Sequence, residues 1–512
     1  MYSKVITLFH NPPIISVECQ VSKGLPSFII VGLPSKSVQE SKDRVKGALN
    51  FLGINLPPKK VVINLHPIDV SKQGNHFDLP IAVCILKALG YLKSETNFIV
   101  AGELSLNGEI LPVKSILSYL INLKDFSLKD FSLENFQYFV FPEGNKNELA
   151  VIKNNFPLKI KFISHLSEVL DIDKIRIFND FKEIEAKEDL EDYINLFESI
   201  SGQEFAKYAL AVAAAGNHNI LMIGPPGTGK SILSKASLCL FPSPSEEEFI
   251  EIAKIYNLAG YEYEYWKKFK FIRPYRSPHH TSSYASIVGG SKEAKLGEIT
   301  LAHKGILFLD EFAEYSRNVL EALREPLENK KIVISRADAK IEYPADFVLI
   351  AAMNPCPCGY YKTNVKDCLC PVSKISKYWS KISGPILDRI DISIEVSNVT
   401  FENLYSKNKT HFDYYKNLVN QAQETKKERK QTKNNSELSI EEINKFCFNQ
   451  LNKEAKKLIE NIYESKKLSI RKFHKILKIS RTIADINCRN NIEEGDILNA
   501  YKLTFNRYHE NF

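Results

Sequence analysis

The sequence lacks any long apolar run: no stretch stays apolar for the roughly 18 residues that a membrane-spanning helix needs. The first residues, MYSKVITLFHNPPIISVECQ, also lack the basic start, the unbroken apolar core and the small-residue cleavage site of a secretory signal. The 512 residues, 44% of them apolar and 25% charged, are otherwise typical of a globular chain with about three domains. We therefore expect a cytoplasmic protein without membrane association.

A disulfide framework is also missing. Five of the nine cysteines are scattered singly along the chain: Cys19, Cys84, Cys239, Cys447 and Cys488. The other four form two C-x-C pairs around a short loop: Cys356, Cys358, Cys368 and Cys370. Four thiolates in two close pairs can supply a tetrahedral Zn²⁺ site. This spacing is less diagnostic than C-x-x-C pairs, so reduced structural thiols and a labile disulfide remain alternatives to a structural zinc.

Strong charge imbalance is absent as well, since the net charge is only +7. The basic excess lies at the C-terminal end, where residues 401–512 hold 22 lysines and arginines against 15 aspartates and glutamates. Such a bias permits a polyanionic partner, and a solvated helix face explains it equally well.

The pattern of apolar residues changes along the chain and predicts an α/β protein in several parts. Residues 1–170 alternate short β-type runs with helical patterns and read as one mixed α/β domain. Residues 171–195 are rich in acids and lysine, which is typical of a linker. Residues 196–398 follow the strand, loop, helix order of a doubly wound parallel sheet, and residues 399–512 are almost wholly helical in pattern.

A glycine loop between an apolar strand and an amphipathic helix is the most informative motif. Asn219–Ile223 reads as the strand and Ile232–Leu240 as the helix, which is the context that a G-x-x-x-x-G-K-S phosphate-binding loop requires. Backbone N–H groups and the helix N-terminus favour a bound anion there. We expect Lys230 to reach the β- and γ-phosphates of ATP and Ser231 to ligate Mg²⁺. The predicted ATP-binding residues are Gly224, Pro225, Pro226, Gly227, Thr228, Gly229, Lys230 and Ser231.

Two further apolar strands end in polar residues of the kind that ATP hydrolysis needs. Gly305–Leu309 runs into Asp310 and Glu311, and ligands of open parallel sheets bind at the carboxyl ends of strands. We expect Asp310 to position the Mg²⁺ shell and Glu311 to polarise the attacking water, although the pair could merely cap a helix. A third strand ends at Asn354, which is a candidate for holding that water or a simple turn former.

Basic residues beyond these strands predict contacts with other molecules. Arg389, just before an apolar strand, is the candidate arginine finger for a neighbouring subunit's γ-phosphate, with pairing to Asp388 or Asp391 as the alternative. Residues 332–343 read as a hairpin with Arg336 and Lys340 near its tip. Such a tip can grip DNA phosphates or can be a plain exposed turn.

The polar, glycine-ended segment 276–290 reads as a functional loop. It contains His279 and His280, but no carboxylate or cysteine stands at a spacing that would complete a metal site. A structural or channel-lining role is therefore favoured.

Together the stretches GPPGTGKS, GILFLDEF, AAMNPCPCG, ISGPILDRIDI and LSIRKFHKILKISRTIAD resemble the magnesium-chelatase-like AAA+ ATPases of the ComM/YifB type. The resemblance covers nearly the whole chain. It implies a Lon-protease-like N-terminal α/β domain, an AAA+ P-loop module and a C-terminal helical lid. It also implies that Arg389 is the arginine finger and that Arg471 is a nucleotide-sensing lid arginine. The family is implied to form hexameric DNA motors that promote branch migration in natural transformation.

The predicted Lon-like domain departs from working Lon proteases. The position of their serine nucleophile aligns with His76, and that of their lysine with Leu117. Without a Ser–Lys pair, acyl transfer has neither nucleophile nor base, so no peptidase activity is expected.

The sequence therefore leaves three candidate functions. The favoured one is a ring-forming, ATP-driven DNA translocase of the helicase type with single-stranded or branched DNA as its partner. An AAA+ protein-remodelling ATPase without protease activity is the alternative, and a metal-chelatase motor subunit is the least favoured.

Overall fold

The structure is a computed structural model that describes residues 1–92, 97–124, 136–155, 159–178, 189–290, 295–335, 340–364, 366–399 and 411–504. The chain divides into two compact units: residues 1–185 with 253–267, and residues 186–252 with 268–512. The boundary near residue 185 falls inside the predicted linker 171–195. No helix in the described ranges is both long and apolar enough to cross a membrane.

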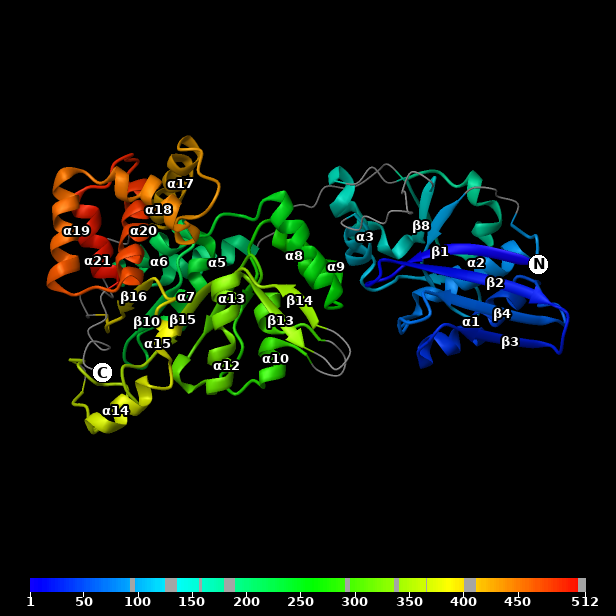
Figure 1. Ribbon diagram of the computed structural model, residues 1–512, viewed down its shortest axis with the longest axis horizontal. Coiled ribbons are helices and arrows are strands. Elements are labelled where there is room, and N and C mark those ends of the chain that lie inside the picture. The colour runs from blue at the N-terminus through cyan, green and yellow to red at the C-terminus, as the bar shows by residue number, and fades with distance from the viewer. Residues whose placement is uncertain are drawn as a thin grey trace. The chain divides into compact units, whose positions relative to one another are not determined.

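The first unit is built on a seven-stranded mixed sheet with the order β3-β4-β2-β1-β5-β8-β9 (Figure 1). Its strands are β1 (Tyr2–Leu8), β2 (Ile14–Ser22), β3 (Ser27–Val31), β4 (Lys60–His66), β5 (Phe98–Val100), β8 (Tyr138–Pro142) and β9 (Ile160–Ile163). The helices are α1 (Lys36–Phe51), α2 (Asp78–Ala88), α3 (Ile116–Lys124) and α4 (Lys146–Leu149), and a small hairpin joins β6 (Glu103–Leu104) to β7 (Ile110–Leu111). Side chains of β1, β2 and β4 alternate between buried and more exposed positions, as expected for a sheet with one covered face. Helix α2 is buried almost throughout and forms the centre of this core.

The segment 253–267 belongs to the first unit, although the sequence placed it in the ATPase module. It comprises the end of α8 (Glu246–Leu258) and all of α9 (Tyr263–Trp266). Its Asn257 accepts a hydrogen bond from the Ser118 backbone N–H at 3.0 Å and donates one to Glu148 at 2.9 Å. Asn145 donates a second hydrogen bond to Glu148 at 2.8 Å. A buried polar cluster therefore ties this segment to the rest of the unit.

The second unit contains a five-stranded parallel sheet with the order β11-β12-β15-β10-β16. The strands are β10 (Ile220–Ile223), β11 (Tyr275–Arg276), β12 (Ile306–Leu309), β15 (Val348–Met353) and β16 (Ile392–Glu395). Every residue of β10, β12 and β15 is buried, which explains their continuous apolar runs, since both faces of a parallel sheet are normally covered. The predicted doubly wound α/β module is confirmed.

The helices of this module are α5 (Asp189–Ser199), α6 (Glu204–Gly216), α7 (Lys230–Ala236), α10 (Tyr284–Val288), α11 (Glu298–Leu301), α12 (Arg317–Ala322), α13 (Arg324–Asn329), α14 (Val372–Trp379) and α15 (Gly384–Leu387). A separate hairpin pairs β13 (Lys331–Ser335) with β14 (Lys340–Pro344) in antiparallel register. The hairpin predicted for residues 332–343 is therefore present, offset by one residue at each end.

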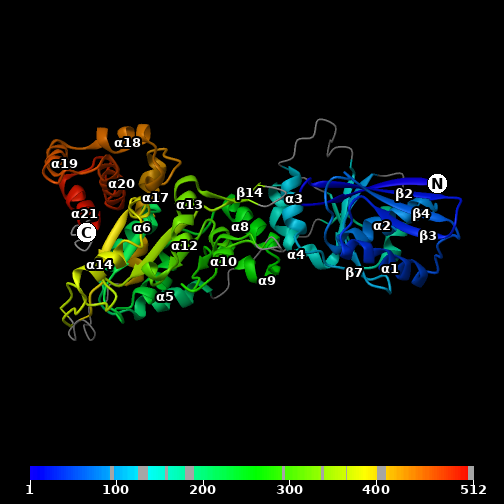
Figure 2. The same ribbon diagram turned by 60° about the horizontal axis from the view of Figure 1, so that its bottom comes forward.

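The predicted helical lid is also confirmed. It consists of α17 (Phe412–Glu428), α18 (Ile440–Phe446), α19 (Lys453–Ser465), α20 (Ile470–Ile486) and α21 (Glu494–Thr504), which gather beside α6 and β16 (Figures 1 and 2). Ser469 caps α20 by accepting a hydrogen bond from the Lys472 N–H. Inside the lid, the buried Arg481 pairs with Asp485, which Arg429 also contacts at 2.7 Å. These pairs satisfy charges that would otherwise be costly to bury.

A lysine of the lid contacts the end of the helical segment that begins at the P-loop. Lys416 of α17 donates hydrogen bonds to the carbonyl groups of Cys239, Leu240 and Phe241 at 3.0, 3.2 and 3.1 Å. A cation at a helix C-terminus satisfies unpaired carbonyls and complements the helix dipole. This contact fixes the lid to the phosphate-loop segment of the same unit.

We predict that Glu148 makes the first unit less stable at alkaline pH. Burial raises the pKa of Glu148 from 4.5 to about 8, although the amides of Asn145 and Asn257 oppose the shift. The folded unit therefore keeps a proton that the unfolded chain releases. The free energy of unfolding should fall between about pH 4.5 and pH 8, by at most about 1.4 kcal/mol per pH unit, and then level off.

Urea unfolding can be followed through Trp266, because only Trp266 and Trp379 are present and Trp266 lies in the first unit. In a Trp379→Phe background, the Glu148→Gln variant should show a much flatter dependence of stability on pH than its parent. Identical slopes in the two proteins would contradict the assignment.

Candidate functional site

The glycine loop connects β10 to α7 and passes very close to the neighbouring strand. A Cβ atom added at Gly224 would lie 2.1 Å from the Val396 carbonyl oxygen, so only glycine fits there. Gly229, which precedes α7, has a φ of 83°, and an added Cβ would meet nothing within 4 Å. The loop thus has a left-handed turn and an open face beside the first turn of a helix, as anion binding requires.

Lys230 is the principal cation of this loop. Its Nζ donates to the carbonyl oxygens of Gly224 and Pro225 at 2.8 Å each and lies 3.4 Å from Asn354 Oδ1. Burial lowers the pKa of Lys230 to about 8, while the negative charge of Asp310 opposes the shift. An anion in the loop would favour the protonated form of this amine.

The two acids after β12 lie beside the loop. Ser231 Oγ donates a hydrogen bond to the Asp310 carboxylate, which also accepts one from the Glu311 backbone N–H at 2.9 Å. Glu311 has a φ of 50°, a left-handed conformation that is uncommon for a residue other than glycine. Its Oε2 lies 2.9 Å from Nδ1 of His280. A hydroxyl and a carboxylate in contact provide the hard oxygen ligands that Mg²⁺ prefers.

One cleft of about 660 Å³ brings these groups together. Lys230, Ser231, Asp310, Glu311 and Asn354 all line it, although they come from the ends of three different strands. The other lining residues are Pro226, Gly227, Thr228, Gly229, Ile232, Ser277, Pro278, His279 and His280. The volume and the polar lining suit a small anionic ligand.

The wall formed by residues 277–280 was not predicted as part of this site. The sequence indicated a functional loop but favoured a structural or channel-lining role for its histidines. The structure places the loop directly after β11, next to β12 in the sheet, so His280 reaches Glu311. Only the order of the strands reveals this proximity, because β11 and β12 are about thirty residues apart in the sequence.

The two arginines predicted to act on nucleotide lie outside the cleft. Arg389 donates to the Pro385 carbonyl at 2.7 Å and forms an ion pair with Glu328. Arg471, at the start of α20 with 64% of its side chain exposed, lies 3.5 Å from Asp388. The alternative pairing of Arg389 with Asp388 or Asp391 is therefore wrong, since Asp391 instead contacts His218 at 3.3 Å.

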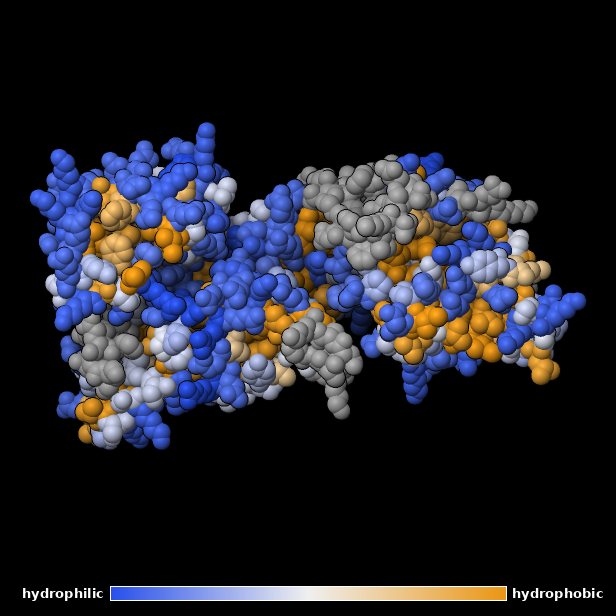
Figure 3. Space-filling view, in the orientation of Figure 1, coloured by the Kyte–Doolittle hydropathy of each residue, from blue (hydrophilic) through white to orange (hydrophobic). Residues whose placement is uncertain are grey.

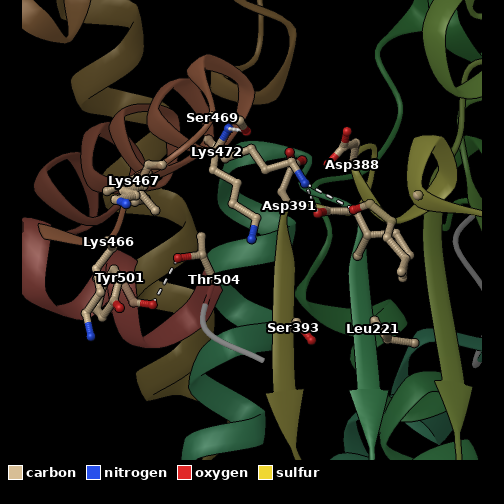
Figure 4. Close-up of a pocket in the computed structure, with 16 residues that line it drawn as sticks. Leu221, Asp388, Asp391, Ser393, Lys466, Lys467, Ser469, Lys472, Tyr501 and Thr504 are labelled. Atoms are coloured by element: carbon tan, nitrogen blue, oxygen red, sulfur yellow. Dashed lines mark hydrogen bonds between the residues drawn. The ribbon is translucent and has the colours of Figure 1, made fainter. Parts of the chain in front are cut away.

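A second pocket, of about 360 Å³, lies next to these arginines, between the start of β16 and the lid (Figure 4). Asp388 and Asp391 line it from the ATPase module, and Ser469 and Lys472 line it from the lid. Lys475 closes one side by donating to the Leu387 and Ile390 carbonyls at 3.1 and 2.6 Å. This pocket shares no lining residue with the phosphate cleft.

The four paired cysteines converge after β15. Their sulfur atoms all lie within 4.8 Å of one another. Cys356 Sγ is 3.3 Å from Cys358 Sγ and 3.7 Å from Cys368 Sγ, close to the ~3.8 Å that a tetrahedral ion with ~2.3 Å bonds to sulfur requires. Burial opposes ionisation of Cys358, but hydrogen bonds from the Tyr360 backbone and from neighbouring thiols lower its pKa to about 6. The cluster is able to bind a metal ion.

The structure describes only part of the predicted basic hairpin. Arg336 lies outside the described residues. Lys340 begins β14 opposite Ser335, and its side chain is not among those described. The hairpin strands themselves are joined by an ion pair of 2.9 Å between Lys331 and Glu342.

The two residues at the positions of the Lon serine and lysine are buried. His76 packs against the rings of Phe77 and Tyr119, with centroids at 4.2 and 5.4 Å, and burial lowers its pKa to about 4. Leu117 is fully buried. The two positions therefore hold a neutral, enclosed imidazole and an aliphatic side chain, and the absence of peptidase activity stays a prediction.

Comparisons with known proteins match this arrangement along the chain. Residues 196–404 match the family model described as magnesium chelatase, subunit ChlI, residues 17–136 match subunit ChlI of Mg-chelatase, and residues 413–504 match the ChlI C-terminal model. Lon protease 2 of Bacillus subtilis is 26% identical over 181 residues, which cover 31% of this chain and 33% of that protein.

Two relatives match almost the full length. Competence protein ComM of Haemophilus influenzae is 35% identical over 504 residues, covering 95% of this chain and 94% of the relative. The uncharacterized protein YifB of Escherichia coli is 37% identical over 490 residues, covering 93% and 91%. With this similarity and the geometry above, the chain belongs to the ComM/YifB family of magnesium-chelatase-like AAA+ proteins.

Proposed function

We propose that this chain is an ATP-hydrolysing motor whose subunits form a ring, most simply a hexamer, and move along DNA to promote branch migration during recombination or transformation. The observation that carries the proposal is the cleft that unites Lys230, Ser231, Asp310, Glu311 and Asn354. Membership of the AAA+ family supports the ATPase part.

The residues of the cleft fit ATP and Mg²⁺. Lys230 supplies a buried cation at the open face of the glycine loop, and Ser231 with Asp310 supplies two oxygen ligands in contact. Bound Mg²⁺ would neutralise charge on the phosphates and hold them in place. Glu311 would then accept the proton of an attacking water, and Asn354 would hold that water beside the phosphates.

A ring would give the two arginines a function at the site of a neighbouring subunit. No arginine is among the described residues that line the cleft, although phosphoryl transfer gains about 10³–10⁵ in rate from an arginine at the transition state. Arg389 and Arg471 both lie around Asp388, apart from their own cleft. We propose that a subunit offers both to the nucleotide of its neighbour.

Three features favour DNA as the substrate of the motor. The sequence predicts two basic residues, Arg336 and Lys340, near the tip of the hairpin formed by β13 and β14, where basic side chains can hold phosphates. The face of the lid helices seen in Figure 3 is mostly hydrophilic, and this C-terminal part carries the basic excess of the chain. The relative from Haemophilus influenzae is named a competence protein.

The first test is steady-state ATPase activity with no DNA, single-stranded DNA, duplex DNA and a four-way junction. We expect DNA to stimulate the ATPase rate, most strongly with the junction, because the proposed motor would couple hydrolysis to movement along DNA. The Glu311→Gln variant should bind nucleotide normally and lose at least ~100-fold in kcat, since it lacks the general base. A robust rate that is the same with every DNA would reject the DNA motor.

The second test addresses the shared site. The Arg389→Ala variant keeps an intact cleft but lacks the proposed finger, and the Lys230→Ala variant keeps the finger but lacks the lysine of the glycine loop. Each variant alone should therefore lose about 10³-fold in kcat. Mixed in equal amounts, the two should recover measurable ATPase activity, because an intact cleft then meets an intact arginine. Mixed oligomers that form without any recovery would show that Arg389 does not act on a neighbour.

We further propose that the cysteine cluster holds a structural Zn²⁺. All four ligand positions would be filled by sulfur, so the ion would stabilise the insertion and take no part in catalysis. We expect about one zinc per chain by metal analysis and its loss in a Cys368→Ser/Cys370→Ser variant, with Cys488→Ser as the control at an exposed cysteine outside the cluster. A stoichiometry near zero in protein purified with zinc present would reject the site.

The similarity to a Lon protease supports a second candidate function, the remodelling of proteins without cleavage. A DNA-indifferent ATPase that unfolds a tagged model protein would favour it. A role as a metal-chelatase motor subunit is supported only by the shared ATPase module.

A further inference from the structure

The two arginines proposed to act on a neighbouring subunit lie on different elements. Arg389 lies between α15 and β16, whereas Arg471 lies in the first turn of the lid helix α20. Two groups that act on one nucleotide must keep a fixed separation, because a misplacement of about 1 Å can lower a rate by about 10²-fold. Joint action of the two arginines therefore requires that α20 be fixed to the residues around Arg389.

The backbone around Arg389 is held by Asn219, the residue before β10. Asn219 Nδ2 donates to the Arg389 carbonyl at 2.9 Å, and the Asp391 backbone N–H donates to the Asn219 carbonyl at 3.0 Å. Asn219 Oδ1 in turn accepts a hydrogen bond from the Leu349 N–H of β15 at 2.8 Å. The segment that carries Arg389 is thus tied to β10 and β15 of the sheet.

His218, the residue before Asn219, connects the same place to the lid. Its Nδ1 lies 3.3 Å from Asp391 Oδ2, and its Nε2 lies 2.8 Å from Oγ1 of Thr482 in α20. His218 and Thr482 are both fully buried. Burial opposes ionisation of Asp391, but the hydrogen bond with His218 helps to hold its pKa below the usual value. One imidazole therefore joins the residue before β16 to the lid helix.

Gly216, the last residue of α6, permits this close approach. A Cβ added there would lie 2.3 Å from His218 Nε2 and 2.5 Å from Thr482 Oγ1, so a side chain would force the two groups apart. A buried polar group that loses its partner stays desolvated without compensation. The contact between His218 and Thr482 therefore favours one position of α20 over others.

Lys475 makes a second connection between the same two parts. It lies one turn after Arg471, on the same face of α20. Its ammonium group donates to the carbonyl oxygens of Leu387 and Ile390 at 3.1 and 2.6 Å, and these two residues bracket Arg389 in the sequence. The first turns of α20 are therefore held against the segment that carries the proposed finger.

We propose that His218 and Lys475 are positioning residues that hold Arg389 and Arg471 as one unit, so that a subunit presents both arginines together to its neighbour's nucleotide. The inference rests on the proposed sharing of the site between subunits. It adds that the lid acts on the neighbouring cleft through its fit to the residues around Arg389. Loss of either connection then impairs hydrolysis in the neighbour's cleft and spares the cleft of the same subunit.

A mixture of Arg389→Ala and Lys230→Ala subunits tests this prediction, because only the Lys230→Ala subunit supplies an intact finger. Lys475→Met in the Lys230→Ala subunit should lower the recovered ATPase rate by about tenfold, since it displaces the arginines that the mixture uses. The same substitution in the Arg389→Ala subunit should leave the recovered rate nearly unchanged. Lys457→Met, at an exposed lysine of α19, is the matched control and should have no effect in either subunit.

The buried contact is tested with Thr482→Val, which removes the hydroxyl that His218 contacts and keeps the branched shape of the side chain. In the Lys230→Ala subunit it should lower the recovered rate severalfold, and Thr482→Ser, which keeps the hydroxyl, should restore most of it. In the Arg389→Ala subunit neither substitution should matter. Equal losses in both subunits, or full recovery in both, would overturn the role of the connection concerned, because a general loss of folding does not depend on which subunit carries the substitution.

These outcomes differ from a failure of the proposed function. Mixed oligomers of Arg389→Ala and Lys230→Ala subunits that show no recovery would reject the shared site, and this inference with it. Recovery that no DNA stimulates would reject the DNA motor, but the comparison between the two subunits would still decide the roles of His218 and Lys475, because its readout needs no DNA.

Discussion

Burial of both faces of the parallel sheet is the constraint on which the rest of this structure depends. β10, β12 and β15 consist entirely of buried residues, so polar groups have no place along them and appear only where the strands end. Because the strands are parallel, those ends meet at one edge. Lys230 and Asn354 therefore come within 3.4 Å of each other although 124 residues separate them.

The same edge bears on the proposal that neighbouring subunits share the cleft. On that proposal, the glycine loop, the acid pair and Asn354 would supply phosphate binding, oxygen ligands and a base, whereas Arg389 and Arg471 contact Glu328 and Asp388 outside the cleft. A ring in which each subunit completes its neighbour's site would make hydrolysis depend on assembly. Such dependence would suit a motor, because a subunit outside the ring would hydrolyse little ATP.

His280 contacts the acid pair from the loop of a neighbouring strand. Its loop follows β11, which lies beside the strand that leads to Glu311. Farther along the chain, Gly289 and Gly290 lie against Ile334 of the hairpin. An added Cβ at either glycine would come within about 3 Å of Ile334, so a side chain there would push the two elements apart. This close packing, with the positive φ of both residues, makes glycine necessary at the two positions.

Much of the site could be predicted from local patterns. The glycine loop, the acid pair, Asn354 and the two C-x-C pairs are each recognisable because their chemistry needs particular residue types at short spacing. The contact of His280 with Glu311 and the packing of residues 253–267 with the first unit could not, since both depend on segments that are distant in the sequence. The ion pair of Arg389 with Glu328 was missed for the same reason, because Glu328 is 61 residues away.

By itself, the sequence determined the classes of local structure, the residues of the phosphate loop and the absence of a Ser–Lys dyad, because these depend on side-chain chemistry and short-range spacing. Only the tertiary structure decided which strand lies beside which, and hence that His280 faces Glu311 while Arg389 and Arg471 face away from the cleft. Strand order is set by how the whole sheet buries its apolar faces, and no single segment of the chain carries that information.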